Sequence, residues 1–113
     1  MHELSLCGAI ADIVTRRAAD RDVAVIHLRI GRLRQIVPDT LVFCWSMISA
    51  DTDLAGSVLE IERIAAELKC RACATDFGIG DGINLVCPAC GGLDAEVIAG
   101  EEFLVTALEL AEV

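Results

Sequence analysis

Two pairs of cysteines constrain this chain more than any other feature of its sequence. Cys70 and Cys73 form one CxxC pair, Cys87 and Cys90 form the second, and thirteen residues separate the two pairs. A CxxC turn lets two thiolates reach the same ion, and two such turns complete the tetrahedral shell that structural zinc takes. Two glycines follow Cys90 and allow the backbone conformations that a turn needs just past its last ligand. The pattern predicts a zinc site with these four cysteines as its ligands.

Disulfide bonds and an iron centre are the alternatives to zinc. The six cysteines are an even number, as a disulfide framework requires, but the N-terminus lacks the basic segment of a secretory signal, so we expect a reducing compartment. Four thiolates also suit iron, as in a rubredoxin-like electron carrier. A zinc-stabilised adaptor without a transferable metal is a further interpretation. Cys7 and Cys44 lie in segments with helical periodicity, and we expect them to be small buried hydrophobic residues.

Composition narrows the class of protein. The 113 residues suffice for one domain with a small satellite, and hydrophobic residues make up 55% of them, so a real core can form. The net charge of −9 argues against nucleic acid and anionic membrane surfaces, because phosphate binding relies on clustered Lys and Arg. No apolar run approaches the ~20 residues that span a bilayer. We therefore expect a soluble, cytoplasmic protein.

Hydrophobic periodicity predicts two helices. Apolar residues recur at helical spacing from residue 4 to about residue 20, which gives one stripe along a helix. A second helix should begin near Pro38, because proline suits the first turn of a helix. The apolar stripe of this second helix runs from Leu41 to Ile48.

Three further segments alternate as strands do. They cover residues 23–31, 57–63 and 103–110. The last of them must return to the sheet formed by the first two, because alone it could bury nothing. Its alternation runs through Leu104, Thr106, Leu108 and Leu110.

These elements predict an α+β fold in which two helices pack on a three-stranded sheet, with an inserted zinc-ribbon-like module. We expect residues 1–66 plus 100–113 to form the α/β domain and residues 67–99 to form the zinc-binding domain. The module holds few large apolar side chains, so it cannot fold by burial alone and depends on its metal.

The N-terminus offers a second set of metal ligands. The α-amine of Met1, the backbone amide of His2 and the His2 imidazole are linked through successive chelate rings, and such nitrogen donors favour Ni²⁺ or Cu²⁺. Glu3 can add its amide or carboxylate, or hold the imidazole in place. Taken alone, however, a histidine at position 2 is more often a solvated terminal residue, and Glu3 then only complements the dipole of a first helical turn. His27, the other histidine, is predicted to be exposed on a strand.

The N-terminus and the cysteine pairs both belong to a series of motifs that resembles one known protein family. The stretch Met-His-Glu-Leu-Ser-Leu at residues 1–6 is followed by Ile-Gly-Arg-Leu at 30–33 and Val-Pro-Asp-Thr-Leu-Val-Phe at 37–43. Both CxxC pairs come next, with Cys-Pro-Ala-Cys-Gly at 87–91, and Gly-Glu-Glu-Phe-Leu at 100–104 ends the series. In this order and at this length the chain resembles the HypA/HybF hydrogenase nickel-incorporation proteins.

The resemblance implies a function and its residues. It implies a nickel metallochaperone that binds Ni(II) transiently and delivers it, with the GTPase HypB, to the large subunit of [NiFe]-hydrogenase; some members also serve urease maturation proteins. His2 is then the nickel ligand, assisted by the Met1 amine and the backbone around Glu3, and the four paired cysteines (Cys70, Cys73, Cys87 and Cys90) hold structural Zn(II). We expect no enzymatic turnover, because the sequence shows no nucleophile paired with a base. Both a monomer and a homodimer are compatible with this reading.

Overall fold

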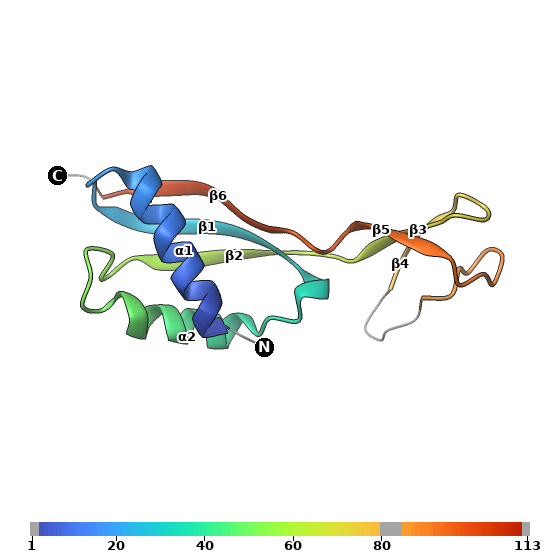
Figure 1. Cartoon of the computed structure of the whole chain (residues 1–113), viewed down its shortest axis with the longest axis horizontal. Coiled ribbons are helices and arrows are strands. Elements are labelled where there is room, and N and C mark those ends of the chain that lie inside the picture. The colour runs from blue at the N-terminus through green and yellow to red at the C-terminus, as the bar shows by residue number, and fades with distance from the viewer. Residues whose placement is uncertain (1–2, 80–84, 112–113) are drawn as a thin grey trace. The chain divides into compact units, whose positions relative to one another are not determined.

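The computed structural model describes residues 3–79 and 85–111, and its chain divides into two compact units. The first unit comprises residues 1–29, 35–62 and 103–113, and the second comprises residues 30–34 and 63–102. Figure 1 shows the elements of both units, coloured along the chain. Within the described residues, no helix is long and apolar enough to cross a membrane.

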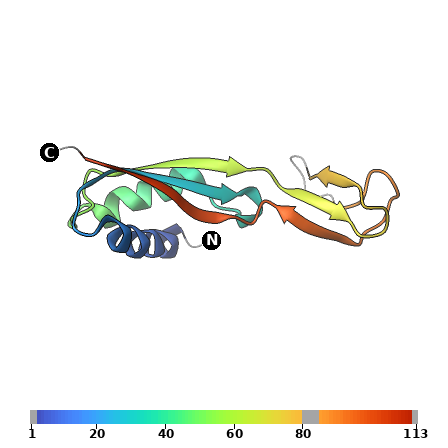
Figure 2. The same cartoon turned by 90° about the horizontal axis from the view of Figure 1, so that it is seen from above.

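The first unit is built from two helices and three strands. In chain order these are α1 (Glu3–Ala18), β1 (Val23–Gly31), α2 (Pro38–Ser49), β2 (Val58–Ile64) and β6 (Phe103–Leu110). The strands form one sheet in the order β2-β1-β6. Both helices lie on the same side of this sheet (Figure 2). The predicted arrangement of two helices on a three-stranded sheet is confirmed.

The sheet of the first unit is mixed. The arrows of β1 and β2 point the same way in Figure 2, and α2 is the crossover helix that such a parallel pair needs. β6 runs antiparallel to β1, because hydrogen bonds join opposite ends of the two strands. The Ala111 N–H donates to the Asp22 carbonyl at one end, and the Gly31 N–H donates to the Glu102 carbonyl at the other.

The core of the first unit lies between the helices and β1. Burial recurs along each helix at the spacing of about one turn, so each helix presents one face to the sheet and to the other helix. Trp45 is 2% exposed, and its indole N–H donates to the Ser57 hydroxyl at 3.0 Å. As predicted, Cys7 is a buried core residue, whereas Cys44 is only half-buried. The buried residues of α1, α2 and β1 include Cys7, Ile10, Val14, Ala18, Leu41, Trp45, Ser49, Ile26, Leu28 and Ile30.

One detail of the predicted strand pattern is wrong. The segment 103–110 does form β6, but burial along it does not follow the alternation of Leu104, Thr106, Leu108 and Leu110. Leu104 and Leu110 are exposed, whereas Val105 is 8% exposed and is the buried residue of the strand. β6 lies at the edge of its sheet, so it is covered over only part of its length. Alternating hydrophobicity therefore predicted the strand but not its buried face.

The second unit is a small antiparallel sheet. Its strands are β3 (Glu67–Cys70), β4 (Asp76–Gly78) and β5 (Ala95–Ala99), and β3 pairs with both of the others. Four buried residues form its core, and two of them are cysteines of the CxxC pairs. These core residues are Leu68, Cys70, Phe77 and Cys87.

Backbone segments of the second unit approach closely at Gly31, Ala66 and Gly100. A Cβ atom on Gly31 would lie 1.9 Å from the Gly100 carbonyl oxygen, and one on Gly100 would lie 2.7 Å from the Cα of Ala66. The Leu33 N–H, in the short 3-10 turn η1 (Arg32–Arg34), donates to the Gly100 carbonyl at 2.9 Å. Only glycine fits at positions 31 and 100, because any side chain would collide with backbone atoms.

Candidate metal centre

The four paired cysteines meet at one point of the second unit. Their sulfur atoms all lie within 4.8 Å of one another. Cys70 Sγ is 3.6 Å from Cys90 Sγ, and Cys73 Sγ is 3.6 Å from Cys87 Sγ. Four sulfurs bound at 2.3 Å around one zinc ion would be separated by about 3.8 Å, the edge of the tetrahedron. The cluster therefore has the dimensions of a tetrathiolate metal site, and among the described residues it is the one such group of His, Cys, Asp or Glu side chains.

Two turns of matching geometry present these sulfurs. In the first turn the Ala74 N–H donates to the Cys70 carbonyl at 2.8 Å, and the Cys70 N–H donates to the Thr75 carbonyl at 2.9 Å. In the second turn the Gly91 N–H donates to the Cys87 carbonyl at 2.8 Å, and the Cys87 N–H donates to the Gly92 carbonyl at 2.9 Å. The residue after each second cysteine has a left-handed backbone, with φ of 65° at Ala74 and 73° at Gly91. The two turns thus repeat one structure.

The sulfur atoms differ in how readily they lose a proton. Hydrogen bonds with the side chain and backbone of Thr75, helped by the Cys87 sulfur, lower the pKa of Cys73 to about 6. The backbone N–H of Gly92 lowers the pKa of Cys90, but the neighbouring sulfurs together raise it more, to about 12. Thiolates this close repel one another, and a bound cation removes that conflict. Metal binding must therefore release protons, and metal affinity must fall as the pH falls.

Only one of the predicted nickel residues lies within the described structure. Met1 and His2 fall outside the described residues. The Glu3 carboxylate accepts a hydrogen bond from the backbone N–H of Val37 at 3.2 Å, and Val37 is the N-cap residue of α2. This contact holds the first turn of α1 at the N-terminal end of α2. It also gives Glu3 a structural role that its position in a first helical turn did not reveal.

His27 has partners that the sequence pattern did not indicate. Its side chain is 32% exposed, so it is half-buried and not fully exposed as predicted. The Nε2 atom lies 2.5 Å from a carboxylate oxygen of Glu109, and Nδ1 lies 3.5 Å from one of Glu60. β1 is the central strand of its sheet, so His27 is flanked by residues of β6 and β2. These contacts explain His27 as part of a cross-strand polar cluster.

Comparison with known proteins decides the family. A family model described as "Hydrogenase/urease nickel incorporation, metallochaperone, hypA" matches residues 1–110. The chain belongs to the HypA family. The hydrogenase maturation factor HypA of Geotalea uraniireducens is 40% identical over 110 residues, which are 97% of this chain and 99% of that protein. The HypA of Dehalococcoides mccartyi strain CBDB1 is 40% identical over 113 residues, covering 97% and 94% of the two chains.

Solved HypA structures share the fold of this family member. The solution structure of the Ni metallochaperone HypA from Helicobacter pylori aligns with a TM-score of 0.69 at 19% identity and covers 97% of each chain. A second solution structure of a HypA protein aligns with a TM-score of 0.70, also at 19% identity. The HypA fold is therefore retained although four residues in five differ.

The paired turns of this HypA chain predict how two opposite substitutions act. A residue with a Cβ atom is strained in the left-handed conformation by about 1 kcal/mol. Ala74→Gly removes this strain from the first turn, and Gly91→Ala adds it to the second. A Cβ on Gly91 would meet nothing within 4 Å, so its effect is conformational and not a collision. Chelator competition should show metal held about fivefold more tightly by Ala74→Gly and about fivefold less tightly by Gly91→Ala.

The control for this pair is Ala72→Gly, since Ala72 is an exposed residue of the same first turn and does not have a positive φ. Ala72→Gly should bring no gain in metal affinity. Equal gains from Ala72→Gly and Ala74→Gly would show that the left-handed conformation is not what limits the first turn.

Proposed function

We propose that this chain is a nickel metallochaperone that binds Ni(II) at its N-terminus and delivers it, with a GTPase partner, for hydrogenase maturation. The observation that carries the proposal is the HypA family match over residues 1–110, which includes the N-terminal Met-His-Glu. The relatives from Geotalea and Dehalococcoides are named hydrogenase maturation factors. In this proposal the GTPase is HypB, the recipient is the large subunit of [NiFe]-hydrogenase, and the site of action is the cytoplasm. The urease maturation proteins are a second recipient for the same metal in this proposal.

The nickel ligands proposed are nitrogen atoms at the N-terminus. The Met1 amine, the His2 backbone amide and the His2 imidazole supply donors in a tetragonal arrangement that suits Ni²⁺. The carboxylate of Glu3 accepts a hydrogen bond from the Val37 N–H, so we expect Glu3 to contribute its backbone amide to the nickel site. Such a site suits a carrier, because a partner can reach the metal and displace its ligands one at a time.

For the four-cysteine site we propose structural zinc. Zinc has no redox chemistry and prefers the closed tetrahedral thiolate shell that the sulfur distances match. A chaperone that hands on one metal needs its structural metal to stay in place, and the chain needs no catalytic turnover for this task. Transfer of the metal requires only that the ligands of the recipient displace those of the chaperone.

We further propose that residues 67–99 fold as a zinc-binding domain and residues 1–66 with 100–113 as the nickel-binding domain. The division of the chain into two compact units supports this proposal. The second compact unit is larger than the proposed zinc-binding domain, since it also includes residues 30–34, 63–66 and 100–102. Residues 30–34 belong to it because Gly31 and Leu33 donate hydrogen bonds to the carbonyls of Glu102 and Gly100. The zinc-binding segment has few buried residues of its own, so its folding should depend on the ion.

His2→Ala tests the nickel proposal. This variant should lose tight nickel binding but keep its zinc content and thermal stability, because the core of the first unit is formed by side chains of α1, α2 and β1. Isothermal titration with Ni²⁺ on untagged protein measures the loss. His27→Ala is the matched control, since it removes the other histidine of the chain and should leave nickel affinity unchanged.

Extension of the N-terminus by a few residues ahead of Met1 belongs to the same test. It converts the amine into an amide, which is harder to deprotonate, and should weaken nickel binding although His2 is intact. Normal nickel binding by both His2→Ala and the extended protein would refute the N-terminal site.

Cys87→Ser tests the zinc-binding domain. Structural zinc contributes on the order of 10 kcal/mol to folding its own segment, so loss of a buried ligand should release the ion and unfold residues 67–99. Amide NMR spectra with metal analysis should show the signals of α1, α2 and β1 retained while those of β3 and β5 collapse.

Cys44→Ser is the matched control, because Cys44 is half-buried in α2 and outside the cysteine cluster. It should keep zinc and both sets of signals. Cys87→Ser protein that retains stoichiometric zinc, or that loses the whole fold, would contradict the proposed division.

A further inference from the structure

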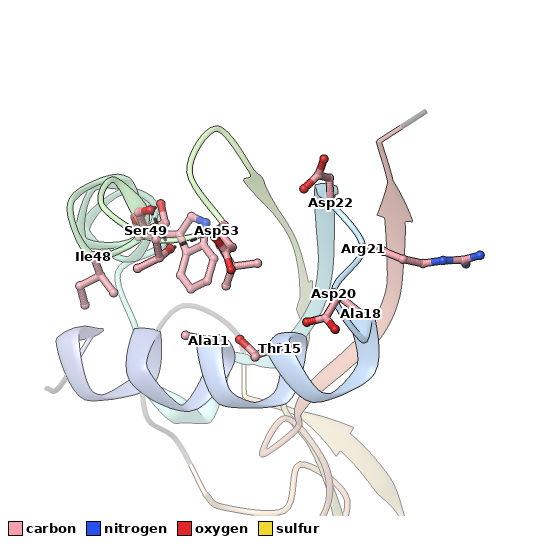
Figure 3. A pocket seen from close by; sticks show the side chains of 12 residues that line it. Ala11, Thr15, Ala18, Asp20, Arg21, Asp22, Ile48, Ser49 and Asp53 are labelled. Atoms are coloured by element: carbon pink, nitrogen blue, oxygen red, sulfur yellow. Dashed lines mark hydrogen bonds between the residues drawn. The ribbon is translucent and has the colours of Figure 1, made fainter. Parts of the chain in front are cut away.

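A cavity of about 410 Å³ lies in the first unit, where α1 and α2 end. Its walls come from the last turns of both helices and from the turns that follow them (Figure 3). The volume lies within the range of sites that bind small ligands or single side chains. None of the residues proposed to bind nickel or zinc lines this cavity, so it has no part in the function proposed above.

Apolar side chains line much of the helical side of the cavity, next to the polar residues Thr15 and Ser49. Ala11 of α1 and Trp45 and Ile48 of α2 line it, together with Leu54 from the turn after α2. Trp45 is anchored by the hydrogen bond from its indole N–H to Ser57, and Leu54 is 7% exposed. Trp45 and Leu54 are buried, so the half-buried side chains of Ala11 and Ile48 offer most of the apolar surface against which an aliphatic chain can pack.

The turns beside the cavity carry carboxylates. Asp20 and Asp22 follow α1, and Asp53 follows α2. All three are exposed, and none of them forms an ion pair with any residue in the described part of the chain. Arg21 also lines the cavity, but its guanidinium points away from the other labelled side chains in Figure 3. The charge presented at the opening is therefore negative.

The ends of the two helices add to this negative potential. α1 ends at Ala18 and α2 at Ser49, and both residues line the cavity. The C-terminus of a helix carries a partial negative charge of about half an electron, so the two dipoles act in the same sense as the carboxylates. The arrangement is an apolar wall beside a cluster of negative charge, which matches a cation carried on an aliphatic stem.

We propose that this cavity binds an exposed lysine or arginine side chain of a partner protein. The stem of the side chain packs against Ala11 and Ile48, beside the buried ring of Trp45, and its charged head lies between Asp20 and Asp53. The carboxylates are gathered at the two turns and not spread along the walls, so the site suits one cationic head and not the several charges of a free polyamine. The net charge of −9 on the chain favours approach of a basic surface.

Fluorescence of the full-length protein tests the proposal directly. Trp45 is the single tryptophan and the chain has no tyrosine, so the intrinsic emission comes from one residue that lines the cavity. N-acetyl-lysine methylamide and N-acetyl-arginine methylamide should change the emission saturably, with affinity that falls as salt screens the exposed charges. N-acetyl-norleucine methylamide, which has the stem without the charge, should bind at least about threefold more weakly.

Asp20→Asn combined with Asp53→Asn should weaken binding of the lysine probe about tenfold, roughly threefold for each charge. Asp51→Asn is the matched control, because Asp51 is exposed in the same turn as Asp53 but does not line the cavity. Zinc content and circular dichroism establish that the variants are folded.

Four results would overturn the proposal. They are the absence of saturable binding by either cationic probe, equal binding of the norleucine probe, equal losses from Asp51→Asn and the double variant, and tighter binding of spermidine than of the lysine probe. The last result would assign the cavity to a free polyamine. Nickel binding is expected to be unchanged in every variant, so failure of this proposal is distinguishable from failure of the nickel site.

Discussion

The convergence of four sulfur atoms within 4.8 Å of one another is the contact on which the second unit depends. Leu68 and Phe77 are the only buried residues of its described core that are not cysteines, and a sheet of three short strands cannot fold on so little apolar surface. The cysteines close the unit at one end, and the contact between Gly31 and Gly100 closes it at the other. Local backbone geometry helps to bring the four sulfurs together, since both CxxC turns place a left-handed residue directly after the second cysteine.

The first unit is stabilised differently, by ordinary burial between two helices and a sheet. At its N-terminal end, the hydrogen bond from the Val37 N–H to the Glu3 carboxylate joins the start of α1 to the start of α2. In the proposed function, the chain offers a thiolate shell to one metal and a set of nitrogen donors to another. Zinc and nickel would then compete poorly for each other's ligands, because soft thiolates suit zinc, whereas amine, amide and imidazole nitrogens suit nickel.

Local patterns in the sequence predicted most of the fold of the first unit and the clustering of the four paired cysteines. β1 and β6 begin and end at the predicted residues, and α2 begins at Pro38. α1 ends at Ala18 and not near residue 20, because Ala19 and Asp20 adopt left-handed backbone conformations that no periodicity reveals. The buried face of β6, the bond between Glu3 and Val37, and the partners of His27 all depend on contacts between residues far apart in the chain. Such contacts are set by tertiary packing, so a single sequence does not specify them.

X-ray absorption at the zinc and nickel edges of one sample, prepared without a tag and loaded with both metals, tests the central claim most directly. The claim is that the chain holds two metals on two chemically distinct donor sets. The zinc edge should fit four sulfur neighbours at about 2.3 Å, and the nickel edge should fit nitrogen and oxygen neighbours with no sulfur. A sulfur shell around nickel, or loss of the four-sulfur zinc shell when nickel is added, would contradict the account.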